Sequence, residues 1–171
     1  MKRTLVPLFI LLLFSFSGGS FLRATQESAS KEMSIPILTL DSKGSELRRS
    51  FTYTSGIEEP LRVVIRDREA WRDIWKRIHR PLSELPSLPE IDFSLEVIVV
   101  VALGARPNSG YGIIVDRAFE SNDQLEIVVR RVSQRNCGVF AMMTQPVDVV
   151  RLPKTAHPLV FRETESVHVC N

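Results

Sequence analysis

Short runs of apolar residues alternate with polar breaks along most of the chain, and most of these runs are too short for a helix. The segments 61–67, 111–119 and 124–132 are rich in β-branched residues and are bounded by Pro, Gly, Asn or charged residues, so they predict β-strands. The run 95–103 is interrupted only by Glu96 and shows no polar alternation. We therefore expect this strand to be covered on both faces, at the centre of a sheet.

A strong turn signal, Glu120-Ser121-Asn122-Asp123, separates two of these strands and predicts an antiparallel hairpin. Its outer faces are expected to carry Glu126, Arg130 and Arg131. Further strands are expected at 34–40, 50–56 and 146–152, with two short final strands at 158–164 and 166–170.

One segment, 67–81, has helical rather than strand periodicity. Asp67 can accept hydrogen bonds from the first free amides as an N-cap, and Pro81 is expected to end the helix. The apolar residues recur at helical spacing: Trp71, Ile74, Trp75 and Ile78. The predicted fold class is α+β and β-rich, a two-layer, mostly antiparallel, β-sandwich-like structure with this single amphipathic helix packed on it.

The N-terminus has the pattern of a secretory signal peptide. Lys2 and Arg3 precede an uncharged apolar run over residues 5–16, followed by small residues. The expected organisation is a signal peptide at 1–24, a flexible lead at 25–34 and a single β-rich domain at 35–171. An uncleaved anchor is the alternative, but Pro7 and the short run count against it. We expect export to the periplasm or outside the cell, with no stable membrane insertion after cleavage.

The charge balance excludes a strongly basic binding surface. The chain has 22 basic and 20 acidic residues, and 20 of each sign remain when Lys2 and Arg3, before the apolar run of the expected signal, are left out (22 − 2 = 20). A nearly neutral exported domain offers no electrostatic basis for binding nucleic acid or an anionic membrane.

The two cysteines of the chain, Cys137 and Cys170, are most simply explained as one disulfide in an oxidising compartment. The alternative is a metal site formed with His168, because His168 and Cys170 could share one face of a strand. A fourth ligand is not evident and exported thiols tend to be oxidised, so we expect neither a metal nor another cofactor.

The segments ⟨IDFSLEVIVVVALGARPNSGYGIIV⟩ (91–115) and ⟨MMTQPVDVVRLPK⟩ (142–154), with the Trp-containing helix and the polar hairpin, resemble the PrcB-like family. That family is named for an accessory subunit of a secreted bacterial protease complex. The similar region extends over most of 65–154. Its recurrent signals are Gly104 after the central strand, the turn Asn108-Ser109-Gly110-Tyr111 and the segment Thr144-Gln145-Pro146. Ser109 replaces the first Gly of the usual pair, so the backbone there must tolerate a side chain. The resemblance implies an accessory or stabilising role beside an extracytoplasmic protease, with no catalytic residues to carry over.

The residues themselves give no positive sign of catalysis. A nucleophile elbow would need Gly two residues before Ser109, where Pro107 stands. The three histidines, His79, His157 and His168, have no nucleophile or carboxylate pair beside them in sequence. We therefore expect a non-enzymatic binding protein, and an uncharacterised secreted enzyme is the competing class.

The partner-binding surface is predicted at two segments that the resemblance brings forward. Its residues are Arg106, Asn108, Ser109, Gly110, Tyr111, Thr144, Gln145 and Pro146. Tyr111 offers a large contact area with a polar end, although its ring could instead close the end of the sandwich. The stretch ⟨RPNSGYG⟩ is also similar to the Asn-Pro-Thr-Thr-Gly-Tyr loop of chagasin-like cysteine-protease inhibitors, whose other two loops are absent here. The expected partner is a protein, and a secreted protease is the expected kind. A chagasin-like inhibitor is the alternative function.

Overall fold

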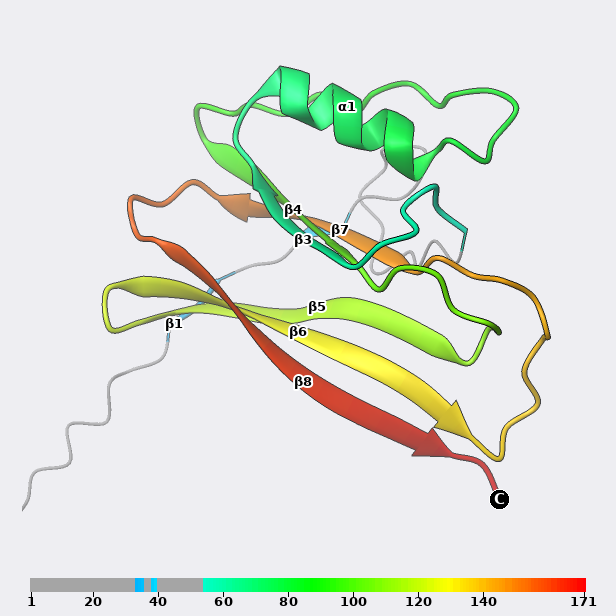
Figure 1. Cartoon of the computed structure of the whole chain (residues 1–171). Helices are drawn as coiled ribbons and strands as arrows, with labels where there is room; N and C mark the ends of the chain where they lie inside the picture. The colour runs from blue at the N-terminus through cyan, green and yellow to red at the C-terminus, as the bar shows by residue number, and fades with distance from the viewer. Residues whose placement is uncertain (1–32, 36–37, 40–53) are drawn as a thin grey trace, which may run out of the picture.

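Two four-stranded sheets face each other in the computed structural model, which describes residues 33–35, 38–39 and 54–171 (Figure 1). The lower sheet in Figure 1 has the order β1 (Met33–Ile35), β5 (Tyr111–Ser121), β6 (Gln124–Arg135), β8 (Leu159–Val169). The upper sheet has the order β2 (Leu38–Thr39), β7 (Val147–Pro153), β4 (Glu96–Ala102), β3 (Leu61–Ile65). Helix α1 (Arg68–Ile78) covers the outer face of the upper sheet. The predicted β-rich sandwich with one helix is confirmed.

The N-terminal predictions fall mostly outside the described residues. The signal peptide at 1–24 and residues 25–32 of the predicted lead are among them, as are residues 50–53 of the predicted strand 50–56. Strand β1 begins at Met33, one residue before the expected end of the lead at 34, and residues 54–56 form no strand. The predicted strand 34–40 is represented by β1 and β2, which pair with β5 and β7 in different sheets.

Strand β4 lies between β3 and β7 and is buried on both faces, as its unbroken apolar sequence predicts. Ile98, Val100 and Ala102 belong to the cluster under α1. Val97, Val99 and Val101 belong to the second cluster, which lies between the sheets and includes residues of β5 and β6. One strand therefore supplies both cores, and it fixes the position of the chain that leaves it at Leu103.

Helix α1 has the predicted cap and the predicted buried face. The Asp67 side chain accepts a 2.9 Å hydrogen bond from the amide of Ala70, and the four apolar residues at helical spacing are buried. The helix ends at Ile78, three residues before Pro81. The indole N–H groups of Trp71 and Trp75 donate to the carbonyls of Pro89 and Pro86, so they hold the proline-rich connection against the helix.

The β5–β6 hairpin turns at Asn122 and Asp123, whose φ angles are 50° and 59°. Asn and Asp tolerate this left-handed region, which two-residue hairpin turns require. One expectation for the hairpin is wrong. Arg131 does not lie on the outer face with Glu126 and Arg130, because it pairs with the fully buried Ile113 and follows the inward-facing alternation of β6.

The C-terminal segment is a single strand, so the prediction of two short strands is wrong. Strand β8 runs parallel to β6 and pairs with it without interruption from Leu159 to Val169. Two acidic residues in its middle, Glu163 and Glu165, face inward, and both contact Arg131. Within the described part of the chain, no helix has the length and apolar character needed to span a bilayer.

Candidate functional site

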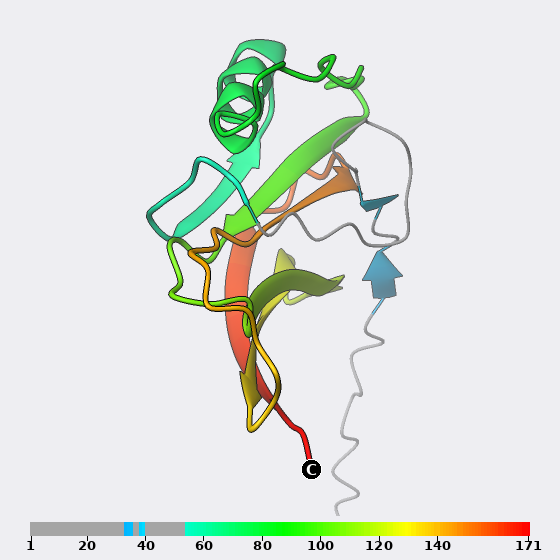
Figure 2. The same cartoon turned by 90° about the vertical axis from the view of Figure 1, so that its right-hand side faces the viewer.

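Two connections between the sheets meet at one end of the sandwich, the end that faces the viewer in Figure 2. The first connection, residues 103–110, leads from β4 to β5, and the second, residues 136–146, leads from β6 to β7. All eight predicted partner-binding residues lie in these connections or directly beside them. We call this region the loop end.

The two connections are joined by main-chain hydrogen bonds. Arg106 and Thr144 form an isolated antiparallel bridge, with N–H to carbonyl distances of 2.8 Å and 2.9 Å. The Thr144 hydroxyl also donates to the carbonyl of Asn108 at 3.0 Å, and the whole residue is buried. Thr144 therefore supports the first connection from beneath.

The predicted turn 108–111 has a defined internal structure. The Asn108 side chain accepts the amide of Gly110 at 2.9 Å. Ser109 exchanges two bonds with Phe140: its amide donates to the Phe140 carbonyl at 3.1 Å, and its hydroxyl accepts the Phe140 amide at 2.9 Å. A serine is accommodated where the family usually has glycine because Ser109 has no positive φ and its hydroxyl bonds the second connection.

Glycine is required at two positions for different reasons. Gly104 has a φ of +78°, and a Cβ atom there would lie 2.8 Å from the Glu58 carbonyl oxygen. A Cβ atom at Gly110 would lie 2.9 Å from Cγ1 of Val139. Gly110 thus serves close approach between the two connections rather than a left-handed backbone.

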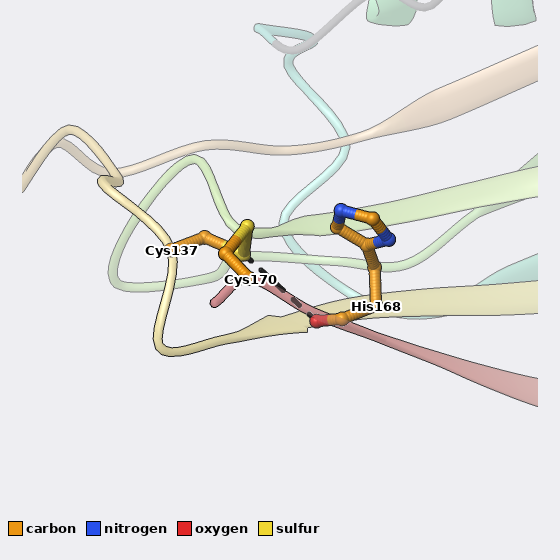
Figure 3. A group of neighbouring side chains, drawn as sticks. All are labelled: Cys137, His168 and Cys170. Carbon is orange, nitrogen blue, oxygen red and sulfur yellow. Dashed lines mark hydrogen bonds between the residues drawn. A yellow bond between two sulfur atoms is a disulfide. The ribbon is translucent and has the colours of Figure 1, made fainter.

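A disulfide joins Cys137, at the start of the second connection, to Cys170, just after β8, with a Cα–Cα distance of 5.0 Å (Figure 3). His168 lies beside this pair, and its ring nitrogen and the two sulfur atoms are within 4.8 Å of one another. Both sulfur atoms are used in the disulfide, so neither is a thiolate ligand for a metal. The bond fastens one end of the second connection to the lower sheet.

The second connection exposes an apolar segment, defined here as Val139, Phe140, Met142 and Met143. Phe140 is 76% exposed. The segment is held by the disulfide on one side and by the Arg106–Thr144 bridge on the other. Sequence reasoning missed these residues. Their signal is the apolar run ⟨GVFAMM⟩ (138–143) between two strands, in a place where a connection is usually polar.

Next to this segment, the loop end is hollowed by an open pocket of about 340 Å³. Leu103, Pro107 and Tyr111 form apolar walls. The polar groups come from Arg106, Arg131, Ser133 and Glu165. Tyr111 also packs against the cluster between the sheets. Tyr111 therefore fits both roles considered for it: it helps to close the end of the core, and part of it is accessible at the pocket.

Burial separates the eight predicted residues into two groups. Gly110, Thr144 and Pro146 are buried, so they offer little surface to a partner. They hold the surface in place. The other five predicted residues are partly exposed and remain available to a partner: Arg106, Asn108, Ser109, Tyr111 and Gln145.

One histidine is perturbed, but it lies away from the loop end. His79 caps the C-terminus of α1, is buried, and bonds the Trp75 carbonyl through Nδ1 at 2.9 Å. Burial lowers its pKa below the ordinary value.

The Ser109 hydroxyl accepts a hydrogen bond from the main-chain amide of Phe140, which gives this serine a structural role in the turn.

The family model described as PrcB C-terminal matches residues 97–153, which confirms the predicted resemblance. The matched region runs from β4 to β7 and includes both connections of the loop end. No curated protein and no solved structure matches the chain. The resemblance to chagasin-like inhibitors has no support from these comparisons.

Proposed function

Because residues 97–153 match the PrcB C-terminal family, we propose that the chain is an exported, non-enzymatic accessory protein that binds an extracytoplasmic protease through its loop end. The family match supports the kind of partner. The main support for binding at the loop end is the apolar segment, because its side chains are exposed although its backbone belongs to a tightly bonded connection.

Exposed apolar side chains gather at this end. The described residues include ten exposed large hydrophobic side chains, and four of them lie within residues 139–143. Val167 and Val169, near the C-terminal end of β8, are two more. Single exposed apolar residues are ordinary on a protein surface, whereas a cluster marks an interaction site. Phe and Met are also enriched where interfaces are buried.

The segment is restrained before any partner arrives. The disulfide, the Arg106–Thr144 bridge and the bonds between Ser109 and Phe140 fix its backbone at three places. A restrained surface loses less conformational entropy on binding, so more of the contact energy appears as affinity. The partly exposed predicted residues, among them Asn108 and Gln145, would form the polar rim.

The test is co-isolation of the mature protein with its partner, followed by measurement of the affinity between the two purified proteins. Phe140→Ser should weaken the complex by at least about thirtyfold, or about 2 kcal/mol, if Phe140 is a binding hot spot. Leu95→Ser is the matched control, because Leu95 is also highly exposed (66%) but precedes β4 at the opposite end of that strand. It should leave the affinity unchanged.

Two outcomes would overturn the proposal. One is a partner without peptidase activity, and the other is equal affinity for the wild type and Phe140→Ser while Leu95→Ser weakens binding. The rate of peptide hydrolysis by the captured protease, with and without this protein, then separates a stabilising subunit from an inhibitor.

A further inference from the structure

The pocket at the loop end combines an apolar wall with one unbalanced positive charge. Its walls include Leu103, Pro107 and the ring of Tyr111. The guanidinium of Arg106, which also lines the pocket, donates only to the carbonyl of its neighbour Ala105, at 3.2 Å. Among the described residues no carboxylate pairs with Arg106.

The other charges of this region cancel one another. Arg131 contacts Glu163 at 3.3 Å and also pairs with Glu165. Arg62 of β3 reaches across the open edge of the sandwich and pairs with Glu163 at 2.7 Å. Two arginines and two glutamates form this network, so its net charge is zero. Glu165 also lines the pocket but is paired with Arg131, so within the described part of the chain Arg106 leaves one positive charge at the pocket without a counterion.

We propose that this pocket binds the C-terminal residue of an extended partner peptide, with its carboxylate on Arg106 and its apolar side chain against Leu103, Pro107 and Tyr111. Arginine binds carboxylates through charge-assisted hydrogen bonds, commonly two at once. This inference rests on the proposed role as a protein-binding subunit and adds the chemistry of the recognised group.

A chain end fits better than an acidic side chain because the cation and the apolar wall line the same pocket. Arg106, Leu103 and Tyr111 all border this single space of about 340 Å³. Only a C-terminal residue of apolar type presents a carboxylate and an apolar side chain together. Two further hydroxyls of the pocket, on Tyr111 and Ser133, can bond the terminal carboxylate or the last amide.

The surface beyond the pocket suits the residues that precede the chain end. In the register of β6 and β8, Ser133 stands beside Val167 and Arg135 beside Val169. Both valines continue the inward-facing alternation of Glu163 and Glu165, yet they are exposed. A bound peptide could therefore pass from the pocket over an apolar stretch of the lower sheet.

The inference is tested with synthetic peptides and the isotope-labelled mature protein, without the protease. An acetylated pentapeptide ending in leucine with a free carboxylate should shift the amide resonances of Tyr111 and Ser133. The same peptide as a C-terminal amide should bind at least about tenfold more weakly, since a charge-assisted bond is lost. A third peptide, an amide with an internal glutamate, separates the chain end from an acidic side chain.

The matched variants are Arg106→Gln and Arg72→Gln. The first should reduce binding of the free acid to the level of the amide, and its main-chain bridge to Thr144 does not need the side chain. The second removes the same charge from an exposed position on α1 and should have no effect. A melting curve for each variant shows that the fold is kept.

Equal binding of acid and amide, tighter binding of the glutamate peptide, or unchanged binding by Arg106→Gln would each overturn the inference. These outcomes are independent of the proposed function, which fails only if no protease binds the loop end. Peptide binding without a protease complex would sink the proposed function alone, and a Phe140-dependent protease complex without peptide discrimination would sink this inference alone.

Discussion

Replacement of Trp75 by alanine should lower the free energy of unfolding by about 3–5 kcal/mol. Trp75 is only 2% exposed, and its ring centroid lies 5.2 Å from that of Trp71 and 3.9 Å from that of His79. A buried tryptophan covers about 200 Å², which at about 25 cal/mol per Å² corresponds to about 5 kcal/mol as an upper estimate. Partial relaxation of the proline-rich connection over the helix lowers the expected loss.

The hydrogen bond of Trp75 adds a second, separable contribution. Its indole N–H donates to the Pro86 carbonyl at 3.0 Å, and Trp75→Phe removes this bond while it keeps an aromatic ring in place. The phenylalanine variant should therefore lose less stability than the alanine variant. The difference between their unfolding free energies reports the cost of the larger cavity that alanine leaves.

Urea unfolding followed by far-ultraviolet circular dichroism measures both variants against the wild type. The assay does not depend on tryptophan fluorescence, which the substitutions change directly. An unchanged midpoint for Trp75→Ala, together with lost binding to the protease, would show that α1 is an interaction surface and that its assignment to the core is wrong.

Three other predictions concern groups whose partners the structure identifies. Because burial lowers the pKa of His79, protonation favours the unfolded state: stability should be complete above the unfolded-state pKa of about 6.5 and should fall as pH drops below it. Unfolding free energies between pH 5 and 8 should show this slope in the wild type and a smaller slope in His79→Leu. The Cys137–Cys170 bond, with a sequence separation of 33, should contribute about 3–4 kcal/mol, so Cys170→Ser should lose that amount in chemical denaturation. Intact mass with and without reductant should differ by two hydrogen atoms, whereas two alkylatable thiols in the native protein would contradict the bond. Asp148 accepts the amide of Val115 at 2.8 Å beside the β-bulge of β5, so Asp148→Ala should cost at least about 1–3 kcal/mol in the same assay.

The elements that the sequence predicted well are those whose signals are local. The unbroken run around Val99 identifies a strand covered on both faces, because neither face has a polar residue to present to water. Asp67 and the spacing of the two tryptophans define the start and the buried face of α1 within a few residues of chain. The Asn122-Asp123 turn likewise needs only its own two residues to be recognised.

The predictions that failed depend on contacts between distant segments. The predicted strands 158–164 and 166–170 are separated at Glu165, the last residue of the charged stretch Arg162-Glu163-Thr164-Glu165. The stretch remains in the strand because its glutamates face Arg131 and Arg62, which come from β6 and β3. The inward direction of Arg131 has the same cause, since the charge is tolerated only where β8 brings carboxylates to it.

The sequence predicted a location for the candidate site but not which exposed side chains form its surface. The motifs at 106–111 and 144–146 lie at the same end of the sandwich as the proposed surface, yet the most constrained of these residues are buried supports. A residue that must be glycine or threonine for close packing gives a strong motif, whereas an exposed contact residue such as Phe140 needs only to be apolar. The strong motifs therefore correspond to residues that support the proposed surface rather than to its exposed side chains.

The location of the apolar segment follows from how the rest of the sandwich is closed. Helix α1 covers the outer face of the upper sheet, and the ion pairs of Arg62 and Arg131 close the edge between β3 and β8. At the loop end the two connections close the gap with main-chain bonds, so the side chains of the exposed apolar segment are not needed for the core. Side chains such as Phe140 and Met143 are consequently free to face outward at no cost to the packing between the sheets. A rigid backbone with dispensable side chains is the arrangement in which contact residues can change while the fold stays the same.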